Sequence, residues 1–282
     1  MARDVLALDI GGTKMLAALV RGDNVIEAHT MPTPRSGDPE EWFAALFAAI
    51  ASWKGRYDTA GVAVTGIIDE GRWSPLNRRT LDIPDRFPLV ATVARLSGLD
   101  RVLAANDAQA AAWGEYSHGA GQGNDLVFLT VSTGIGGGIV VNGRLLGGLA
   151  GHFGQFRSPG EEGRTLEDKV SGHWIAAQAE AHQPGATARD VFAAAADGHG
   201  WACAILAASA RQIALLCGNI QLALDPARIV IGGGIGLAPG YLESVRQALG
   251  VLPPRLTPQL HAAALAERAG VVGIADLARR QN

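Results

Sequence analysis

Two glycine-rich turns, each set between apolar segments, constrain the fold of this chain more than any other feature. Residues 5–10, VLALDI, lead into GGTK at 11–14 and then into a second apolar run, MLAALV. Residues 126–132, LVFLTVS, lead into a glycine-rich stretch at 133–138 and then into IVVN at 139–142. An apolar strand, a glycine turn and a second apolar strand form the pattern of a β-hairpin. Because this pattern occurs twice, far apart in the chain, the sequence predicts an internal duplication.

The segments around these hairpins alternate between helical and strand-like patterns. The predicted helices are 39–53, 108–116, much of 167–222 and a closing helix over GVVGIADLARRQ. The further predicted strands are 61–66, 101–105 and 228–231. This alternation is typical of an α/β protein. We expect an N-terminal α/β domain over 1–118 and a larger C-terminal one over 119–265, with the helix of 266–282 packing back on the first. The polar stretch 156–165 is the best candidate for a mobile loop.

Composition and charge exclude several classes of function. The 282 residues carry a formal net charge of −3, which builds no basic face for nucleic acid or an anionic membrane. We find no apolar stretch near the roughly 20 residues of a membrane span and no signal peptide at the N-terminus. We therefore expect a cytoplasmic enzyme with small-molecule partners. Cys203 and Cys217 lie in an alanine-rich helical stretch and are predicted to be small buried thiols.

Glycine at the end of a strand suits phosphate binding, because it lets the backbone approach closely and present its N–H groups. One such turn usually does no more than close a hairpin. A third glycine run, at 232–234, follows another predicted strand, and three such segments in one chain favour nucleotide binding. Neither a P-loop nor a dinucleotide-binding GxGxxG is present. Asp9 ends the first strand, where its carboxylate would hold Mg²⁺ or make a local turn contact with Gly11 and Gly12.

Asn106 and Asp107 lie between a predicted strand and a predicted helix. At the carboxyl edge of a sheet such a position faces the crevice where ligands bind. An ionised Asp107 could accept the proton of a hydroxyl that attacks a γ-phosphate. Asp and Asn are equally favoured as plain helix N-caps, and the residues alone leave both roles open.

Five segments together resemble the ROK family of sugar kinases and repressors, in the family's order and over nearly the whole chain. They are DIGGTK (9–14), ANDAQAAAWGEY (105–116), VSTGIGGGIV (131–140), AGHFGQ (150–155) and IGGGIG (231–236). Segments 62–77, 106–116 and 234–242 resemble the bacterial N-acetylmannosamine kinases of that family. The resemblance implies a duplicated actin-like ATPase (ribonuclease H-like) fold with two domains and a central cleft. It also implies ATP- and Mg²⁺-dependent phosphorylation of the 6-hydroxyl of N-acetylmannosamine, with glucose or N-acetylglucosamine as alternative substrates.

The resemblance assigns roles to individual residues. It implies Asp107 as the general base and Asp9 as the Mg²⁺ residue. The residues that it implies at the sugar are Gly66, Asn77, Asn106, Asp107, His152 and Glu167. Those that it implies at the nucleotide are Asp9, Gly11, Gly12, Thr13, Lys14, Thr133, Gly134, Gly136, Gly137, Gly233 and Gly234.

Two other properties of the family bear on this chain. The family's repressors carry a DNA-binding module before the nucleotide turn; here the DIGGTK segment begins at residue 9, which disfavours that function. The intact Asp107 and glycine turns likewise disfavour a sugar sensor that binds without turnover. The family is often dimeric, and region 167–222 would supply either a homodimer interface or only the core of the second domain.

One departure from the family concerns zinc. The family usually binds zinc through a histidine and three cysteines, but here Gln155 stands at the histidine position and the loop FRSPGEEGRT has no cysteine. A glutamine without thiolates does not make that tetrahedral site, so we expect no structural zinc. Packing and salt bridges must then brace the loop, and the candidates for those salt bridges are Arg157, Glu161, Glu162 and Arg164; the alternative is a solvated loop.

Overall fold

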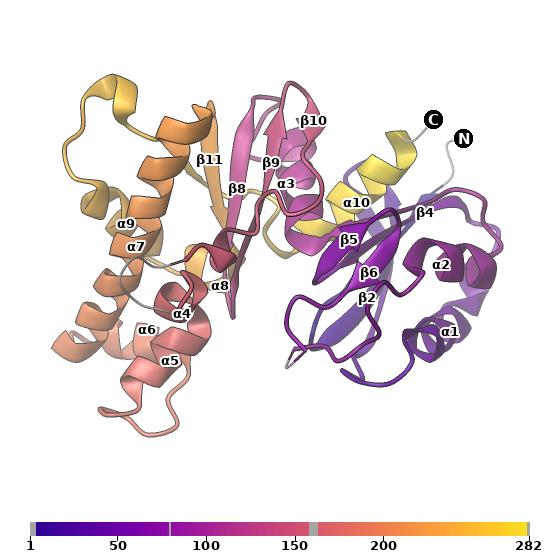
Figure 1. Ribbon diagram of the computed structural model, residues 1–282, viewed down its shortest axis with the longest axis horizontal. Coiled ribbons are helices and arrows are strands. Elements are labelled where there is room, and N and C mark those ends of the chain that lie inside the picture. Colours follow the sequence, from indigo (N-terminus) through magenta and orange to yellow (C-terminus); the bar gives the residue numbers. More distant parts are fainter. Residues whose placement is uncertain (1–3, 79, 158–162, 281–282) are drawn as a thin grey trace.

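Two five-stranded sheets of matching topology organise the computed structural model, which describes residues 4–78, 80–157 and 163–280 (Figure 1). The first sheet has the order β3-β2-β1-β4-β7, and the second has the order β10-β9-β8-β11-β12. The strands of the first are β1 (Asp4–Ile10), β2 (Lys14–Arg21), β3 (Asn24–Pro32), β4 (Tyr57–Val64) and β7 (Val102–Asn106). Those of the second are β8 (Leu126–Val131), β9 (Ile135–Val141), β10 (Arg144–Leu145), β11 (Arg228–Gly232) and β12 (Leu260–Ala262). In each sheet an antiparallel meander of three strands adjoins two parallel ones, so the predicted duplication is confirmed.

Helices cover the sheets and fill the space between them (Figure 1). In the first half they are α1 (Pro39–Ala49), α2 (Leu89–Ser97) and α3 (Asp107–His118). In the second half they are α4 (Glu167–Val170), α5 (Gly172–Ala179), α6 (Ala188–Ala196), α7 (Gly200–Leu224), α8 (Gly233–Gly236), α9 (Tyr241–Leu249) and α10 (Ala269–Arg280). Helix α3 packs against β8 and β9, α10 packs against β1 and β4, and the two helices pack against each other. The last helix thus returns to the first sheet.

The turn of the second hairpin is shorter than predicted. The sequence predicts a turn over 133–138, but strand β9 already begins at Ile135, and Gly136 and Gly137 lie within it. A Cβ added to Gly138 would lie 2.5 Å from the Cβ of Ala112 on α3. Gly136 and Gly138 therefore let α3 pack closely on the strand, where a side chain would push the helix away, and Gly137 makes room for Phe153 on the other face.

Several short or exposed strands are absent from the predictions. They are β3, β10, β12 and the two strands of a small hairpin, β5 (Ile67–Asp69) and β6 (Arg72–Ser74). Strand β3 lies at a sheet edge and is mostly exposed, so it lacks the apolar run that marks β1 and β4. Strand β12 has only three residues, which is too short for a periodic pattern.

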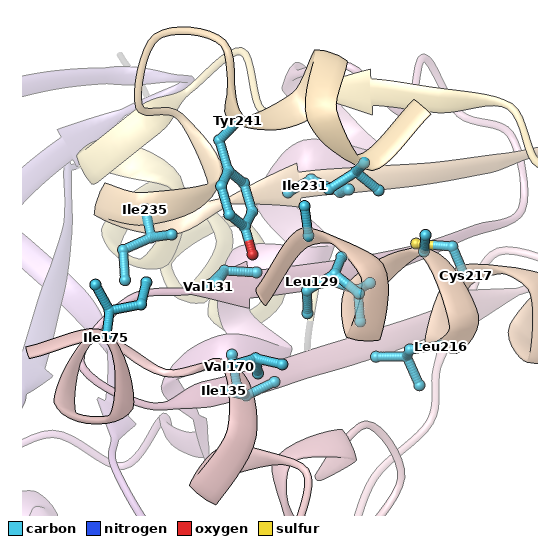
Figure 2. Packing of buried hydrophobic residues seen from close by; sticks show 14 of the residues in the cluster. Leu129, Val131, Ile135, Val170, Ile175, Leu216, Cys217, Ile231, Ile235 and Tyr241 are labelled. Atoms are coloured by element: carbon cyan, nitrogen blue, oxygen red, sulfur yellow. The ribbon is translucent and has the colours of Figure 1, made fainter. Parts of the chain in front are cut away.

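Helix α7 forms the centre of the second half. It is long and apolar enough to cross a membrane by length and composition, with a mean hydropathy of 1.5 over 18 of its residues, and much of its apolar surface belongs to the core of the second half. Figure 2 shows Leu216 and Cys217 of this helix in the cluster that also holds Tyr241. The Tyr241 hydroxyl lies 2.7 Å from Ser209 Oγ, which donates to the Val170 carbonyl. Cys217 is buried but Cys203 is exposed, so the prediction of two buried thiols is wrong for Cys203.

Glu115 ties together the two connections that cross between the halves. Its side chain is fully buried and accepts hydrogen bonds from the N–H groups of Ala120 (2.8 Å), Ala264 (3.0 Å) and Leu265 (2.7 Å). Ala120 lies on the connection from α3 to β8, and Ala264 and Leu265 lie on the connection from β12 to α10. The Glu115 carboxylate therefore holds both connections in place.

We expect Glu115→Ala to lower the free energy of unfolding by about 3 kcal/mol, because it leaves three backbone N–H groups without their acceptor. Urea denaturation measures this effect. Glu243→Ala is the control, since that glutamate is exposed on α9 and its change should cost less than about 0.5 kcal/mol. Equal costs for the two variants would contradict the role of Glu115.

Candidate active site

A pocket of about 510 Å³ lies between the two halves, at the carboxyl ends of β1 and β8. Its size is that of a small-molecule site. It is lined by Asp9, Asp107, Ala108, Ala111, Phe128, Thr130, Gly233, Gly234, Leu237, Ala266, Glu267, Ala269 and Gly270. A second, more open hollow of about 660 Å³ at the opposite edge of the second sheet contains none of the predicted site residues. The chemistry of the first pocket therefore makes it the candidate site.

Asp9 and Asp107 bring two carboxyl groups into this pocket. Burial raises the pKa of Asp9 to about 7, the charge of Asp107 adds to this effect, and Lys14 opposes it. Burial also raises the pKa of Asp107, against the opposing effects of the Ala108 N–H and of His152. A cation between them would favour the ionised form of both groups. Mg²⁺ commonly takes one or two carboxylates and completes its shell with water and phosphate oxygens, so the residues present fit this ion.

Asp9 does not make the local turn contact that was the alternative to a metal role. Its carboxylate faces the start of α10, where a Cβ added to Gly270 would lie 3.2 Å from Asp9 Oδ2. Gly11 instead donates its N–H to the Lys14 carbonyl at 3.0 Å. The first turn is thus closed by its own backbone, and Asp9 remains directed toward the pocket.

The raised pKa of Asp9 predicts a pH-dependent cost to stability. In the unfolded chain Asp9 ionises near 3.8, whereas in the folded protein it does so near 7. The folded state therefore pays an increasing penalty as pH rises from about 4 to 7, and the penalty is constant above that range. We expect Asp9→Asn to raise the free energy of unfolding, and to raise it by about 2.5 kcal/mol more at pH 8 than at pH 5. Urea denaturation at both pH values measures this difference; a gain independent of pH would contradict it.

Asn106 performs the helix capping that Asp107 was equally suited to perform. Its Oδ1 accepts from the N–H groups of Ala108 (3.0 Å) and Gln109 (3.2 Å), and its Nδ2 donates to the Gly66 carbonyl at 2.9 Å. Asn106 is buried, and these three hydrogen bonds leave only its second amide hydrogen available to a ligand. Asp107 follows as the first residue of α3, with Oδ1 2.8 Å from the Ala108 nitrogen. Gly66 is buried with φ +116°, a conformation that favours glycine.

His152 lies near Asp107 with both ring nitrogens buried and without a hydrogen-bond partner among the described residues. Gln109 on α3 holds its loop by donating to the carbonyls of Gly148 (3.0 Å) and Ala150 (2.8 Å). Gly151, with φ +90°, lets the loop touch the Gly137 backbone. An imidazole always carries an N–H, and burying it unpaired is costly. This arrangement favours a polar ligand at His152.

The other two predicted sugar residues lie differently. Glu167, the first residue of α4, accepts from the Ile135 N–H at 2.8 Å and lies against Gly134, so its carboxylate contacts the second hairpin. Asn77 is exposed, and its carbonyl accepts from the N–H groups of Thr80 and Leu81. The structure thus joins Asp107, Asn106, Gly66 and His152 around the start of α3, while Asn77 lies on a separate loop and Glu167 at the start of α4.

Of the predicted nucleotide residues, Asp9, Gly233 and Gly234 line the pocket, and the others lie in the turns and strands of the two hairpins. Gly11, Gly12, Thr13 and Lys14 form the β1–β2 turn, and Thr13 and Lys14 are exposed. Thr133 and Gly134 form the tip of the β8–β9 turn, where Ser132 donates to the Gly134 carbonyl. Gly233 begins α8 with φ +83°, and a Cβ there would clash with the Val131 carbonyl; Gly234 beside it is exposed.

Aromatic packing and backbone hydrogen bonds hold the two described ends of the loop that departs from the family's zinc pattern. Phe153 and Phe156 pack edge to face, with ring centroids 5.5 Å apart, and Leu166 donates to the Phe156 carbonyl at 2.8 Å. Arg157 and Thr165 pair through their backbones. Gln155 is exposed, and Glu161 and Glu162 lie outside the described residues. Across the described ranges no group of three or more His, Cys, Asp or Glu side chains is placed to hold a metal ion.

Sequence reasoning missed several pocket residues. They are Phe128, Thr130, Glu267 and Gly270. Thr130 is the polar residue in an otherwise apolar strand, which is a signal that could have found it. Gly270 comes from the far end of the chain, and no local pattern links it to Asp9.

Comparison with known proteins agrees with this geometry. The model of the ROK family matches residues 5–281. The chain is 49% identical to the bifunctional enzyme NanE/NanK of Brucella melitensis, over 97% of this chain and 54% of that protein, and thus spans about half of its length. It is 41% identical to the N-acetylmannosamine kinase of Shigella flexneri, over 98% of both chains. The structure of a ROK family glucokinase from Streptomyces griseus, in complex with glucose and AMPPNP, superposes with a TM-score of 0.83 at 29% identity, covering 98% of this chain and 99% of that one. The chain therefore belongs to the ROK family, and its two matching sheets form the duplicated actin-like ATPase fold.

Proposed function

We propose that this protein transfers the γ-phosphoryl group of ATP to the 6-hydroxyl of N-acetylmannosamine. The observation that carries the proposal is the imidazole of His152, which is buried near Asp107 and has no hydrogen-bond partner among the described residues, while Asp107 itself lines the pocket. Unsatisfied polar atoms suit a ligand rich in hydroxyl and amide groups. The similarity to the Shigella flexneri enzyme over almost its whole length supports this sugar in particular.

Asp107 acts as the general base in the proposed reaction. It accepts the proton of the 6-hydroxyl as that oxygen attacks phosphorus, and the leaving group is ADP. Asn106 and Gly66 fix the start of α3 and so orient Asp107. The N–H groups of the first and second turns bind phosphate oxygens, and Gly233 and Gly234 lie at the nucleoside. Mg²⁺, held on the Asp9 side of the pocket, supplies charge neutralisation when it is bound with ATP.

We further propose that residues 1–118 and 266–282 form one domain and 119–265 the other. The packing of α10 against β1 and β4 supports placing 266–282 with the first sheet. The enzyme is proposed to be cytoplasmic, in line with its small-molecule substrates, and to need no structural zinc, since Gln155 and its loop offer no thiolate.

A coupled assay of ADP release over a panel of sugars tests the proposal. We expect kcat/KM to be highest for N-acetylmannosamine and lower for glucose and N-acetylglucosamine. Product analysis should place the phosphate on the 6-oxygen. Turnover of another hexose, with none of N-acetylmannosamine, would overturn the assignment of the sugar, and absence of ADP release with every sugar would overturn the kinase itself.

A further inference from the structure

We propose that Thr33 and Arg35 are positioning residues that hold the first glycine turn in its phosphate-binding conformation. This inference rests on the proposed assignment of residues 11–14 to the phosphates of ATP. Both residues follow β3, on the side of the turn away from β1. Neither lines the pocket, so any effect on catalysis must pass through the turn.

The three carbonyl groups of the turn are all held by this short segment. Thr33 Oγ1 donates to the Gly11 carbonyl at 2.7 Å, and Arg35 Nε donates to the Gly12 carbonyl at 3.0 Å. The Thr33 N–H donates to the Thr13 carbonyl at 3.0 Å. Thr33 is buried, with 6% of its surface exposed, whereas Arg35 is exposed.

Holding the carbonyls also orients the N–H groups. A peptide unit is planar and trans, so its N–H points opposite to its C=O. With the Gly11 carbonyl directed at Thr33, the N–H of Gly12 points away from that segment, and the Arg35 contact does the same for the N–H of Thr13. Neither N–H donates to a backbone carbonyl within the described part of the turn and its surroundings. The turn therefore presents two donors in advance of an anion, which is the arrangement of a phosphate-binding nest.

Arg35 has a backbone conformation that is unfavourable for a non-glycine residue. Its φ is +71°, in the region that non-glycine residues rarely adopt. The N–H of Asp82 donates to its carbonyl at 2.8 Å and so stabilises this conformation. Asp82 belongs to the loop that carries Asn77, and Thr80 of the same loop lies so close to Gly12 that an added Cβ there would be 2.6 Å from Thr80 Cγ2. Arg35 thus connects the phosphate turn to the loop of a proposed sugar residue.

Steady-state kinetics of Arg35→Ala and Arg35→Gln test this role. Gln carries its amide nitrogen at the same number of bonds from the backbone as Arg Nε, so it keeps the donor and removes the charge. We expect Arg35→Ala to raise the KM for ATP about tenfold, the loss of one charge-assisted hydrogen bond, while the KM for the sugar stays within about twofold. Arg35→Gln should recover most of the loss. Arg56→Ala is the matched control, because Arg56 is also exposed and pairs with Glu27 away from the turn.

Thr33 provides a second, independent pair of variants. Thr33→Val removes the hydroxyl at nearly constant volume and should raise the KM for ATP, whereas Thr33→Ser keeps the hydroxyl and should not. Circular dichroism checks that each variant is folded. If Thr33→Val does not fold, the Arg35 variants still test the positioning role.

The kinetic results for the Arg35 variants distinguish a failure of the positioning role from a failure of the proposed kinase function. An unchanged KM for ATP in Arg35→Ala, or an equal loss in Arg35→Gln and Arg35→Ala, would overturn the positioning role in an enzyme that still phosphorylates the sugar. If the wild-type protein turns over no sugar, the proposed function fails, and calorimetric titration with ATP tests the same variants directly. A Kd for ATP that is raised in Arg35→Ala and restored in Arg35→Gln would then uphold the role.

Discussion

Replacing Asp107 by Asn should lower kcat by about 10³-fold and leave the Kd for the sugar within about threefold of the wild-type value. The amide keeps the size of the carboxylate and can still accept a hydrogen bond from the sugar, but it cannot take up the proton of the attacking hydroxyl. The cap of α3 belongs to Asn106, so the helix should be unaffected. A single-turnover measurement of phosphoryl transfer, with calorimetry for sugar binding, separates the two effects.

The control for this variant is Asp23→Asn, because Asp23 is exposed in the turn between β2 and β3. It should retain wild-type kinetics. A kcat of Asp107→Asn within about tenfold of wild type would contradict the role of general base, since proton transfer normally contributes more than this factor. If Asp107→Asn instead weakened sugar binding as much as it lowered catalysis, Asp107 would have a role in binding alone.

The fold was predictable because its main signals are local. Each hairpin is marked by two apolar strands and a glycine turn, and the buried strands β4 and β7 each contain a continuous apolar run. The edge strand β3 is mostly exposed and pairs only on one side with β2, so its residues are free of the apolar pattern. Gly136 and Gly137 were misassigned because a glycine selected for close packing on a strand looks the same in sequence as a glycine selected for a turn.

The site was predictable only where its residues end strands. Asp9 lies near the carboxyl end of β1, and Asp107 directly follows β7, a parallel strand of the same sheet, which made their meeting in one pocket foreseeable. The contact of Glu167 with the Ile135 N–H, and the approach of Gly270 to Asp9, depend on how distant segments pack, and no spacing in the sequence encodes them. The same holds for Arg35, whose role depends on its contact with a carbonyl 23 residues away.

His152→Leu should make the protein more stable and less active at the same time. Both ring nitrogens are buried and have no hydrogen-bond partner in the described part of the chain, so the free protein bears the cost of their lost hydration. Leucine fills a similar volume without polar atoms, and we expect it to raise the free energy of unfolding by about 1 kcal/mol. The same change removes the hydrogen bonds proposed for the sugar, so the KM for N-acetylmannosamine should rise about 50-fold while the KM for ATP stays near wild type. Urea denaturation and steady-state kinetics measure the two effects.

The opposite signs of these effects are what make the test specific for a ligand-binding histidine. A histidine that served only to pack the loop would lose stability and activity together when replaced. His29→Leu is the control, since His29 lies partly exposed on the edge strand β3, where its nitrogens can reach water and neither quantity should change by much. A destabilised His152→Leu with unaltered sugar kinetics would remove His152 from the site. A His152→Leu variant that is more stable than wild type but binds the sugar poorly would show that the imidazole is kept for the substrate. In that case the wild-type protein gives up some stability, because the hydrogen-bond partners of His152 come from the bound sugar and not from the described part of the chain.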